Sequence, residues 1–304
     1  MISEAALEAL KGFVPSENIR LRERMSEHTT FRIGGEADCF IELENKEQLL
    51  KVQKYLTAIE EPFFILGNGS NLLVSDEGYR GVILQIGRKM SQIRVEGSRM
   101  IAGAGALLSQ VAKAALAHGL TGLEFACGIP GTVGGGVVMN AGAYGGEMSQ
   151  VVTEVTVTSR DGEVLLLDNE SMEFGYRTST IKNHPFVVTE VAFELEGGDR
   201  QLIQEKMEDL AARRREKQPL EYPSAGSTFK RPEGYFAGEL IMKAGLRGFQ
   251  IGGARVSDKH CGFVVNTGRA TAADVKDVVD EIRERVKDIF HVELQPEIVF
   301  LGRF

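Results

Sequence analysis

The chain of 304 residues is 43% hydrophobic and 26% charged, the composition of an ordinary globular protein that can bury a sizeable core in two or three domains. Its formal net charge of −8 argues against a general nucleic-acid or acidic-membrane binder. The N-terminus lacks the hydrophobic run of a signal peptide, no stretch has the length of a membrane span, and the three cysteines (Cys39, Cys127 and Cys261) have no CxxC spacing, so we expect reduced thiols in a cytoplasmic protein.

The first 120 residues alternate between short helical and short extended patterns. Asn45 followed by Gln48 predicts the start of a helix, and Gly119 predicts the end of a later one. The expected helices are 3–13, 46–59 and 109–118, and the expected strands are 37–43, 62–66, 81–86, 93–95 and 100–102. The strand at 62–66 runs into Gly67-Asn-Gly-Ser-Asn-Leu-Leu73, a loop of small residues that is suited to holding a phosphate.

The stretch Gly122–Gly146 is the most unusual part of the chain, because nine of its 25 residues are glycine. Successive glycines expose backbone N–H groups, and such groups form concave sites for phosphate or pyrophosphate. Apolar residues are interleaved with the glycines, which excludes a flexible linker. We interpret the stretch as a buried loop around a large phosphorylated ligand; the alternative is a tightly packed cluster of turns without a ligand.

The second half of the chain predicts a hairpin, a long strand and then a smaller unit with its own helices. The expected strands are 152–158, 164–167, 186–195, 261–265 and 292–300, and the expected helices follow Asp199, end at Gly245 and begin at Thr271. The mixture favours an α+β fold, with a nucleotide-binding region at 1–197 made of two α+β subdomains and a smaller α+β domain at 198–304.

Several common motifs are absent. Gly103-Ala-Gly105 lacks the third glycine of a Rossmann fingerprint, and the chain has no P-loop, no G-x-S-x-G sequence, and neither HExxH nor a Cys/His cluster that would indicate a metal. We therefore expect no metal site, and phosphates held by a different glycine scaffold.

Seven motifs, in order from about residue 28 to the end, together resemble the UDP-N-acetylenolpyruvoylglucosamine reductase family, also called UDP-N-acetylmuramate dehydrogenases. These motifs are Thr29-Thr-Phe-Arg-Ile-Gly-Gly-Glu-Ala-Asp38, Gly67–Leu73, Gly122–Gly146, Phe174-Gly-Tyr-Arg177, Ala225-Gly-Ser-Thr-Phe-Lys230, Ala244–Ala254 and Gln295-Pro-Glu297. The resemblance implies an FAD-binding fold of the vanillyl-alcohol-oxidase type and a C-terminal domain that binds a UDP-sugar. It also implies non-covalent FAD, with no link to His28, and NADPH as hydride donor. The family works in the cytoplasm on peptidoglycan precursors for cell-wall growth and division; we expect a monomer.

The resemblance also implies which residues act. The catalytic set maps onto Arg177, Ser227 and Glu297, the last returned to the site by the final strand. Arg177 would clamp a carboxylate, Ser227 would donate a proton, and Glu297 would help to stabilise negative charge. Taken singly, Arg177 could also form a surface ion pair, Ser227 could be a turn residue, and Glu297 could be a charge on an edge strand.

The implied binding residues form two groups. The cofactor group is Arg32, Gly67, Asn68, Gly69, Ser70, Asn71, Leu72, Gly122, Gly128, Gly131, Thr132, Gly134, Gly135, Asn140 and Gly142. The substrate group is Tyr176, Lys217, Lys230, Arg231, Lys259 and His260, of which Lys217, Lys259 and His260 would face the diphosphate or would otherwise be solvated charges. Many family members carry Asn where this chain has Arg231, and the short segment 178–185 lacks the inserted tyrosine loop of one subtype.

Two other functions are compatible with parts of the sequence. A sugar or alcohol oxidase of the same fold would explain the glycine loops but not the motifs around Ser227 and Glu297. A nucleotide-binding module without catalysis would bind ligands without turnover. Consumption of oxygen with substrate, or binding without NADPH oxidation, would distinguish these from a reductase.

Overall fold

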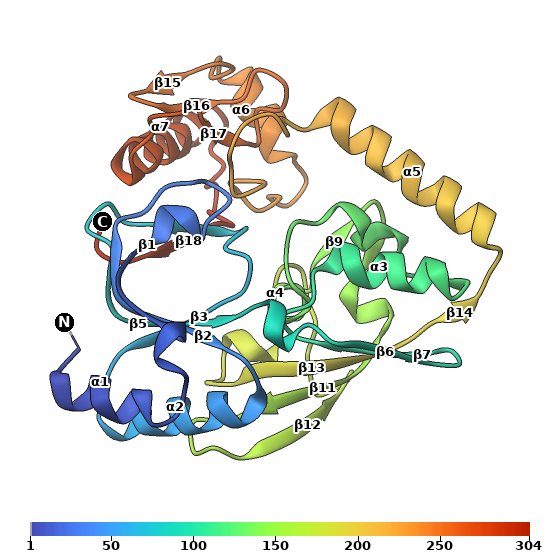
Figure 1. Ribbon diagram of the computed structural model, residues 1–304. Coiled ribbons are helices and arrows are strands. Elements are labelled where there is room, and N and C mark those ends of the chain that lie inside the picture. The colour runs from blue at the N-terminus through green and yellow to red at the C-terminus, as the bar shows by residue number, and fades with distance from the viewer. Residues whose placement is uncertain (1) are drawn as a thin grey trace. The chain divides into compact units, whose positions relative to one another are not determined.

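The computed structural model describes residues 2–304, which divide into two compact units (Figure 1). The first unit contains the segments up to Leu21, Cys39–Asn68 and Gly81–Arg214; the second contains Arg22–Asp38, Gly69–Arg80 and Arg215–Phe304. This division differs from a contiguous one at residue 197, because two early segments belong to the C-terminal unit and most of the helix after Asp199 belongs to the first.

The first unit is built on a five-stranded antiparallel sheet in the order β12-β11-β13-β7-β6 (Figure 1). Its strands are β6 (Ile93–Glu96), β7 (Arg99–Gly103), β11 (Val152–Thr158), β12 (Val164–Asp168) and β13 (Val187–Glu194). The central strand β13 is almost continuously apolar and buried, as expected for a strand covered on both faces. The predicted hairpin around Gly162 is confirmed, with Val157 opposite Leu165.

A second sheet, with strand order β1-β2-β5-β3, contains the strand that leads to the first glycine loop. Its strands are β1 (Ile19–Arg24), β2 (Glu36–Leu43), β3 (Phe63–Leu66) and β5 (Tyr79–Ile86), and β3 pairs with β5 in parallel. The two helices of this region are α1 (Glu4–Lys11) and α2 (Lys46–Ala58). Both predicted helix starts are confirmed, because the side chains of Ser3 and Asn45 accept hydrogen bonds from the first turns of these helices.

The glycine-rich stretch contains more regular structure than the sequence predicts. Before it lies α3 (Leu108–Ala117), and within or beside it are β8 (Leu120–Thr121), the 3-10 helix Glu124–Gly128, α4 (Val133–Val138), β9 (Gly142–Ala143) and β10 (Gly146–Glu147). The expectation of a loop throughout is therefore wrong at α4. Thr132 caps this helix, and Val133 and Val137 are fully buried one turn apart, which offsets the helix propensity lost at Gly134, Gly135 and Gly136.

The second unit packs two helices and a small sheet around its own apolar core (Figure 1). Its elements are β4 (Leu72–Val74), α6 (Ala237–Lys243), β15 (Gln250–Ile251), β16 (Ala254–Val256), β17 (Val264–Asn266), α7 (Ala272–Phe290) and β18 (Val299–Leu301). Thr271 caps α7 as predicted. The remaining elements are β14 (Glu196–Gly197) and the long helix α5 (Arg200–Lys217).

Three expectations about strands need correction. The strand expected at 261–265 is β17 at Val264–Asn266, because residues 260–262 form a turn in which Gly262 N–H donates to His260. The closing strand expected at 292–300 is regular only at Val299–Leu301, where it pairs in parallel with β4; upstream, Pro296 makes a single bridge. Strand β1 is not predicted from the sequence, because its charged residues obscure the alternation of apolar and polar side chains that is typical of a strand.

Candidate active site

Two glycine loops of the first unit lie directly against each other. A Cβ atom placed on Gly67, at the end of β3, would lie 2.5 Å from Oγ1 of Thr132, so only glycine fits there without displacing the threonine. The side chain of Asn68 donates a hydrogen bond to the backbone carbonyl of Pro130. The loop after β3 and the segment before α4 therefore form one continuous surface of backbone.

This surface offers unused hydrogen-bond donors. Within the described residues, the backbone N–H groups of Asn68, Gly131 and Thr132, all in the first unit, donate to no backbone carbonyl. Because unpaired N–H groups are costly when they are shielded from water, such a cluster fits an anion with several acceptor oxygens. The residues present thus suit the pyrophosphate of a dinucleotide.

Two glycines inside α4 use their N–H groups within the protein. The N–H of Gly134 donates to the carbonyl of Ala104 across 2.9 Å, and the N–H of Gly135 donates to the hydroxyl of Thr132 across 3.3 Å. These two glycines therefore do not supply bare N–H groups to a ligand. Gly134 is required for packing, since a Cβ there would lie 3.0 Å from the Cβ of Ala104.

Other glycines of the stretch also permit close packing. A Cβ on Gly142 would lie 2.8 Å from Glu147, and one on Gly128 would lie 2.9 Å from Cδ of Arg214 in helix α5. Gly122 has a φ of +121°, which favours glycine. This part of the stretch agrees with the alternative of a packed cluster of turns, so the two interpretations hold for different glycines.

Arg214 is a candidate that the sequence argument missed. Its Nε is buried and has no hydrogen-bond partner among the described residues, and burial lowers the pKa of its guanidinium. A half-buried arginine whose Nε has no partner, beside a glycine loop, is suited to an anionic ligand. The run Arg213-Arg214-Arg215 is the feature of the sequence that could have indicated this site. In sequence, however, such a run cannot be distinguished from the solvent-exposed face of a helix.

Arg177 is presented by a tight turn of the first unit. Gly175 and Thr178 exchange two backbone hydrogen bonds, which leaves Tyr176 and Arg177 at the tip, and Arg177 has a φ of +56°. Nη2 of Arg177 donates to the carbonyl of Gly142, 3.3 Å away. Tyr176 is 54% exposed, and its ring lies 5.2 Å from the guanidinium carbon of Arg177. A left-handed conformation at a non-glycine residue is common at functional sites.

In the second unit the structure brings the Ser227 loop and Glu297 together. Lys230 N–H donates to Gln295 carbonyl and Glu297 N–H donates to Thr228 carbonyl, at 2.9 and 2.8 Å, around the bridge between Phe229 and Pro296. Ser227 itself is exposed, whereas Thr228 is buried and its hydroxyl accepts from Val264 N–H. Glu297 is half-buried. Two of the three predicted catalytic residues thus lie on segments joined by an isolated bridge, while Arg177 belongs to the other unit.

The same region of the second unit holds the end of the first glycine loop. The side-chain amide of Asn71 donates to the carbonyl of Glu297 across 3.1 Å, and Val299 N–H donates to the carbonyl of Asn71 across 2.9 Å. Leu72 continues into β4 and is buried. Gly69 has a φ of +59°, and a Cβ there would collide with the carbonyl of His28. Arg32 is exposed at a φ of +55°.

The predicted substrate residues differ in their surroundings. Lys217 is exposed at the end of α5, and Arg231 lies 4.0 Å over the ring of Phe236. Lys230 is half-buried, and its N–H is part of the ladder with Gln295. Lys259 donates to the last-turn carbonyl of Arg215 across 2.6 Å, so its ammonium group already stabilises the C-terminus of α5.

His260 lies in a partly buried position. Burial lowers the pKa of its imidazole and so favours the neutral ring. Gly262 N–H donates to Nδ1 across 3.1 Å, which places the remaining proton on Nε2. His260 therefore presents a hydrogen-bond donor at Nε2 rather than a positive charge.

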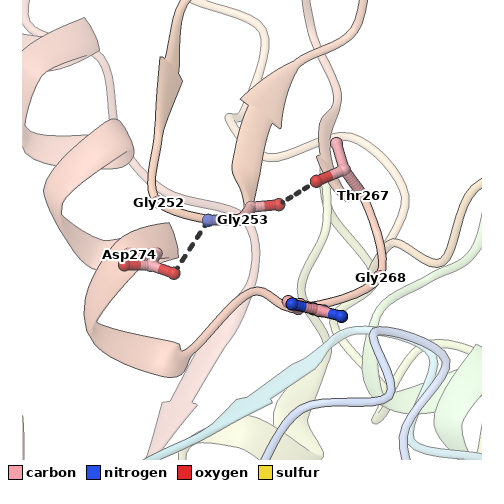
Figure 2. A pocket seen from close by; sticks show the side chains of 6 residues that line it. Gly252, Gly253, Thr267, Gly268 and Asp274 are labelled. Carbon is pink, nitrogen blue, oxygen red and sulfur yellow. Dashed lines mark hydrogen bonds between the residues drawn. The ribbon is translucent and has the colours of Figure 1, made fainter.

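A cavity of about 550 Å³ in the second unit does not involve these residues. Gly252, Gly253, Thr267, Gly268, Arg269 and Asp274 line it (Figure 2). Asp274 accepts from the N–H groups of Gly253 and Thr271 there, as expected for a helix-capping carboxylate. Among residues 2–304 there is no cluster of three metal-ligating side chains, and no helix combines the length and apolarity needed to cross a membrane.

Comparison with known proteins gives consistent matches over the whole chain. A family model described as UDP-N-acetylenolpyruvoylglucosamine reductase, C-terminal domain, matches residues 218–301, and one described as FAD binding domain matches residues 37–168. A UDP-N-acetylenolpyruvoylglucosamine reductase of Caldanaerobacter subterraneus subsp. tengcongensis is 49% identical over 99% of both chains. One of Clostridium perfringens is 50% identical over 96% of this chain and 95% of that protein.

Solved structures agree with these matches. The UDP-N-acetylenolpyruvylglucosamine reductase of Thermus caldophilus superposes with a TM-score of 0.81 and 35% identity, covering 93% of this chain and all of that one. The glucose dehydrogenase Phl p 4.0202 has a TM-score of 0.53 at 13% identity over 65% of this chain and 45% of its own, a likeness of fold alone. The predicted α+β class, with an FAD-binding domain of this oxidase type and a separate C-terminal domain, is confirmed.

Proposed function

This chain belongs to the UDP-N-acetylenolpyruvoylglucosamine reductase family and is an FAD-dependent oxidoreductase of that family, and we propose that Arg177, Ser227 and Glu297 perform its catalytic step. The enzyme uses NADPH to reduce UDP-N-acetylglucosamine enolpyruvate to UDP-N-acetylmuramate in peptidoglycan precursor synthesis. The observation that supports the residue assignment is the bridge between Phe229 and Pro296, because it holds the Ser227 loop beside Glu297.

Bound FAD would supply hydride transfer from NADPH to the vinyl carbon that is remote from the ether oxygen. The protein would then have to stabilise negative charge on the neighbouring carbon and its carboxylate. The forked guanidinium of Arg177 binds that carboxylate and stabilises the charge. Ser227 gives its hydroxyl proton to the carbon and regains one from solvent, and Glu297, in its protonated form or through a polarised donor, stabilises the enolate oxygen.

For the cofactor, we propose that the unused N–H groups of Asn68, Gly131 and Thr132 bind the pyrophosphate. The loop that begins at Gly67 continues through Gly69 and Ser70. Asn71 and Leu72 complete this loop, and Arg32 lies on the segment that follows His28. Arg214, whose buried Nε has no partner among the described residues, would pair with an anionic part of the bound cofactor. Gly122, Gly128, Gly134, Gly135 and Gly142 contribute by allowing the backbone to approach closely.

For the substrate, we propose that charged side chains of residues 215–304 receive the UDP group. Lys217 and Lys230 would contact phosphate oxygens, and His260 would donate from Nε2. Lys259 would act through the end of α5, whose carbonyl it binds. Tyr176 and Arg231 would supply flat surfaces against the sugar nucleotide, which compensates for the absence of a longer insertion after Arg177.

We further propose that the enzyme acts in the cytoplasm as a monomer. Functionally, residues 1–197 would hold most of the FAD, joined by Arg214, and residues 198–304 would hold most of the sugar nucleotide, joined by Tyr176.

The test is an anaerobic visible spectrum of the purified protein. We expect a yellow protein that bleaches with NADPH and recovers its colour when UDP-N-acetylglucosamine enolpyruvate is added. Bleaching without recovery would refute the substrate. Fast recovery with oxygen and an alcohol or sugar substrate, without need for NADPH, would indicate an oxidase instead. A colourless protein that FAD cannot reconstitute would contradict the assignment of the two glycine loops.

A further inference from the structure

The turn that carries Arg177 is held by several contacts besides the hydrogen bond of the arginine side chain to Gly142. A φ of +56° is unfavourable for any residue with a side chain, so the turn Gly175–Thr178 needs support from its surroundings. Ser179 donates from its hydroxyl to the carbonyl of Val138 across 3.1 Å, and Lys182 donates to the carbonyl of Arg177 across 2.8 Å. A further contact comes from one buried amide.

That amide belongs to Asn140, which is 1% exposed. Its Nδ2 donates to the carbonyl of Gly175 across 3.1 Å, and its Oδ1 accepts from the N–H of Ser149 across 2.9 Å. Asn140 itself has a φ of +40°, a region that asparagine tolerates better than most residues. Both polar ends of the side chain are thus bonded to protein, so the side chain fixes the turn rather than facing a ligand.

We propose that Asn140 is a positioning residue for Arg177, an inference that rests on the proposed catalytic role of that arginine. Gly175 is the first residue of the turn. The orientation of its carbonyl determines the direction in which the tip of the turn projects. Asn140 connects this carbonyl to the glycine-rich stretch, where Gly142 accepts the hydrogen bond of the Arg177 guanidinium. Two residues of the glycine-rich stretch, Asn140 and Gly142, therefore hold the turn and the arginine side chain by hydrogen bonds.

The proposal predicts a selective defect. If Asn140 acts only by orienting Arg177, its loss affects the step in which the guanidinium binds the enolpyruvyl carboxylate. Reduction of the flavin by NADPH, which needs no such clamp, changes far less. A misplacement of about 1 Å is enough to slow a positioned reaction by about 10- to 100-fold.

The experiment is a double-mutant cycle with Asn140→Ala and Arg177→Ala, in which stopped-flow absorbance follows both half-reactions of the FAD-loaded enzyme. We expect N140A to slow reoxidation by the enolpyruvyl sugar at least about tenfold while reduction by NADPH stays within about twofold. The double variant should be no slower than R177A alone, because the second substitution removes nothing further. If the two substitutions slow reoxidation independently, so that their fold-effects multiply in the double variant, the proposal for Asn140 is overturned.

Controls separate this inference from the proposed function and from misfolding. Asn169→Ala is the matched control, since this amide donates to the carbonyls of Ser149 and Val152 but not to the turn; it should leave the ratio of the two half-reactions unchanged. Wild-type behaviour of R177A would refute the role of Arg177 itself. If N140A does not fold, Asn140→Asp keeps the shape and the acceptor for Ser149 but removes the donor to Gly175. An unchanged reoxidation rate in N140D would overturn the proposal.

Discussion

The side-chain amide of Asn71 donates to the backbone carbonyl of Glu297 across 3.1 Å, and this hydrogen bond joins residues 226 positions apart. The same two segments continue as the parallel pair β4 and β18. The end of the first glycine loop, proposed to hold the cofactor, is therefore physically attached to a proposed catalytic residue. Four predictions follow from this and related contacts.

Asn71→Ala removes the amide donor and leaves the Glu297 carbonyl without it. We expect the free energy of unfolding to fall by about 1 kcal/mol, the usual net value of one hydrogen bond. Reoxidation of the reduced enzyme by substrate should slow more than its reduction by NADPH, because the displaced group is Glu297. Urea unfolding and stopped-flow spectroscopy measure the two effects. Gln92→Ala removes an exposed amide bonded to Lys89 and serves as control; equal effects of both variants would contradict the prediction.

Ser227→Ala should separate the two half-reactions completely. NADPH still reduces the flavin, because that step needs no proton from Ser227, whereas reoxidation by the enolpyruvyl sugar slows by about 100-fold or more, the usual contribution of a general acid. Anaerobic stopped-flow absorbance measures both rates. Ser224→Ala, in the same loop, is the control, because the contact of Ser224 with Thr30 uses its backbone carbonyl. Equal loss in both half-reactions would exclude Ser227 as proton donor.

Gly67→Ala should weaken cofactor binding. The added Cβ would lie 2.5 Å from Oγ1 of Thr132, so the two loops must separate and their N–H groups no longer converge. A displacement of this kind should raise the Kd for FAD at least about tenfold, which corresponds to about 1.4 kcal/mol. Titration of the apoprotein by flavin fluorescence measures the constant. Gly197→Ala has open space around its Cβ and should leave the Kd unchanged; the same Kd in both variants would refute the prediction.

Glu124→Gln should alter how stability depends on pH. Burial raises the pKa of Glu124, but hydrogen bonds from the Thr121 hydroxyl, from Gly122 N–H and from Lys206 together hold the pKa below its ordinary value of 4.5. A depressed pKa contributes stability above the unfolded pKa, and this contribution is lost as the pH falls through the folded pKa.

We therefore expect Glu124→Gln to lower the free energy of unfolding by about 1–3 kcal/mol at pH 7, and the gap from wild type to shrink below about pH 4.5. Urea unfolding at pH 7 and pH 3.5 measures this gap. Glu205→Gln, on the exposed face of α5, should change the free energy by less than about 0.5 kcal/mol at both values. A gap for Glu124→Gln that is constant with pH would show that the carboxylate charge contributes nothing.

The sequence by itself determined the family, the fold class, the cofactor and most of the regular elements. These depend on local signals: Asn45 and Thr271 cap helices through side chains a few residues away, and the hairpin at Gly162 follows from a turn between two apolar runs. Motifs such as Gly67–Leu73 and Ala225–Lys230 indicate the family, because their order along the chain is specific to it.

Only the tertiary structure decided which glycine N–H groups are unused, and which side chains hold the others. Gly134 and Gly135 look like phosphate ligands in sequence, yet Ala104 and Thr132 take their N–H groups. Asn140 looks in sequence like part of the same phosphate-binding loop, yet its buried side-chain amide donates to the carbonyl of Gly175, 35 residues away. The physical reason is that a hydrogen bond depends on where a partner lies in space, and local sequence encodes the donor without encoding its distant acceptor.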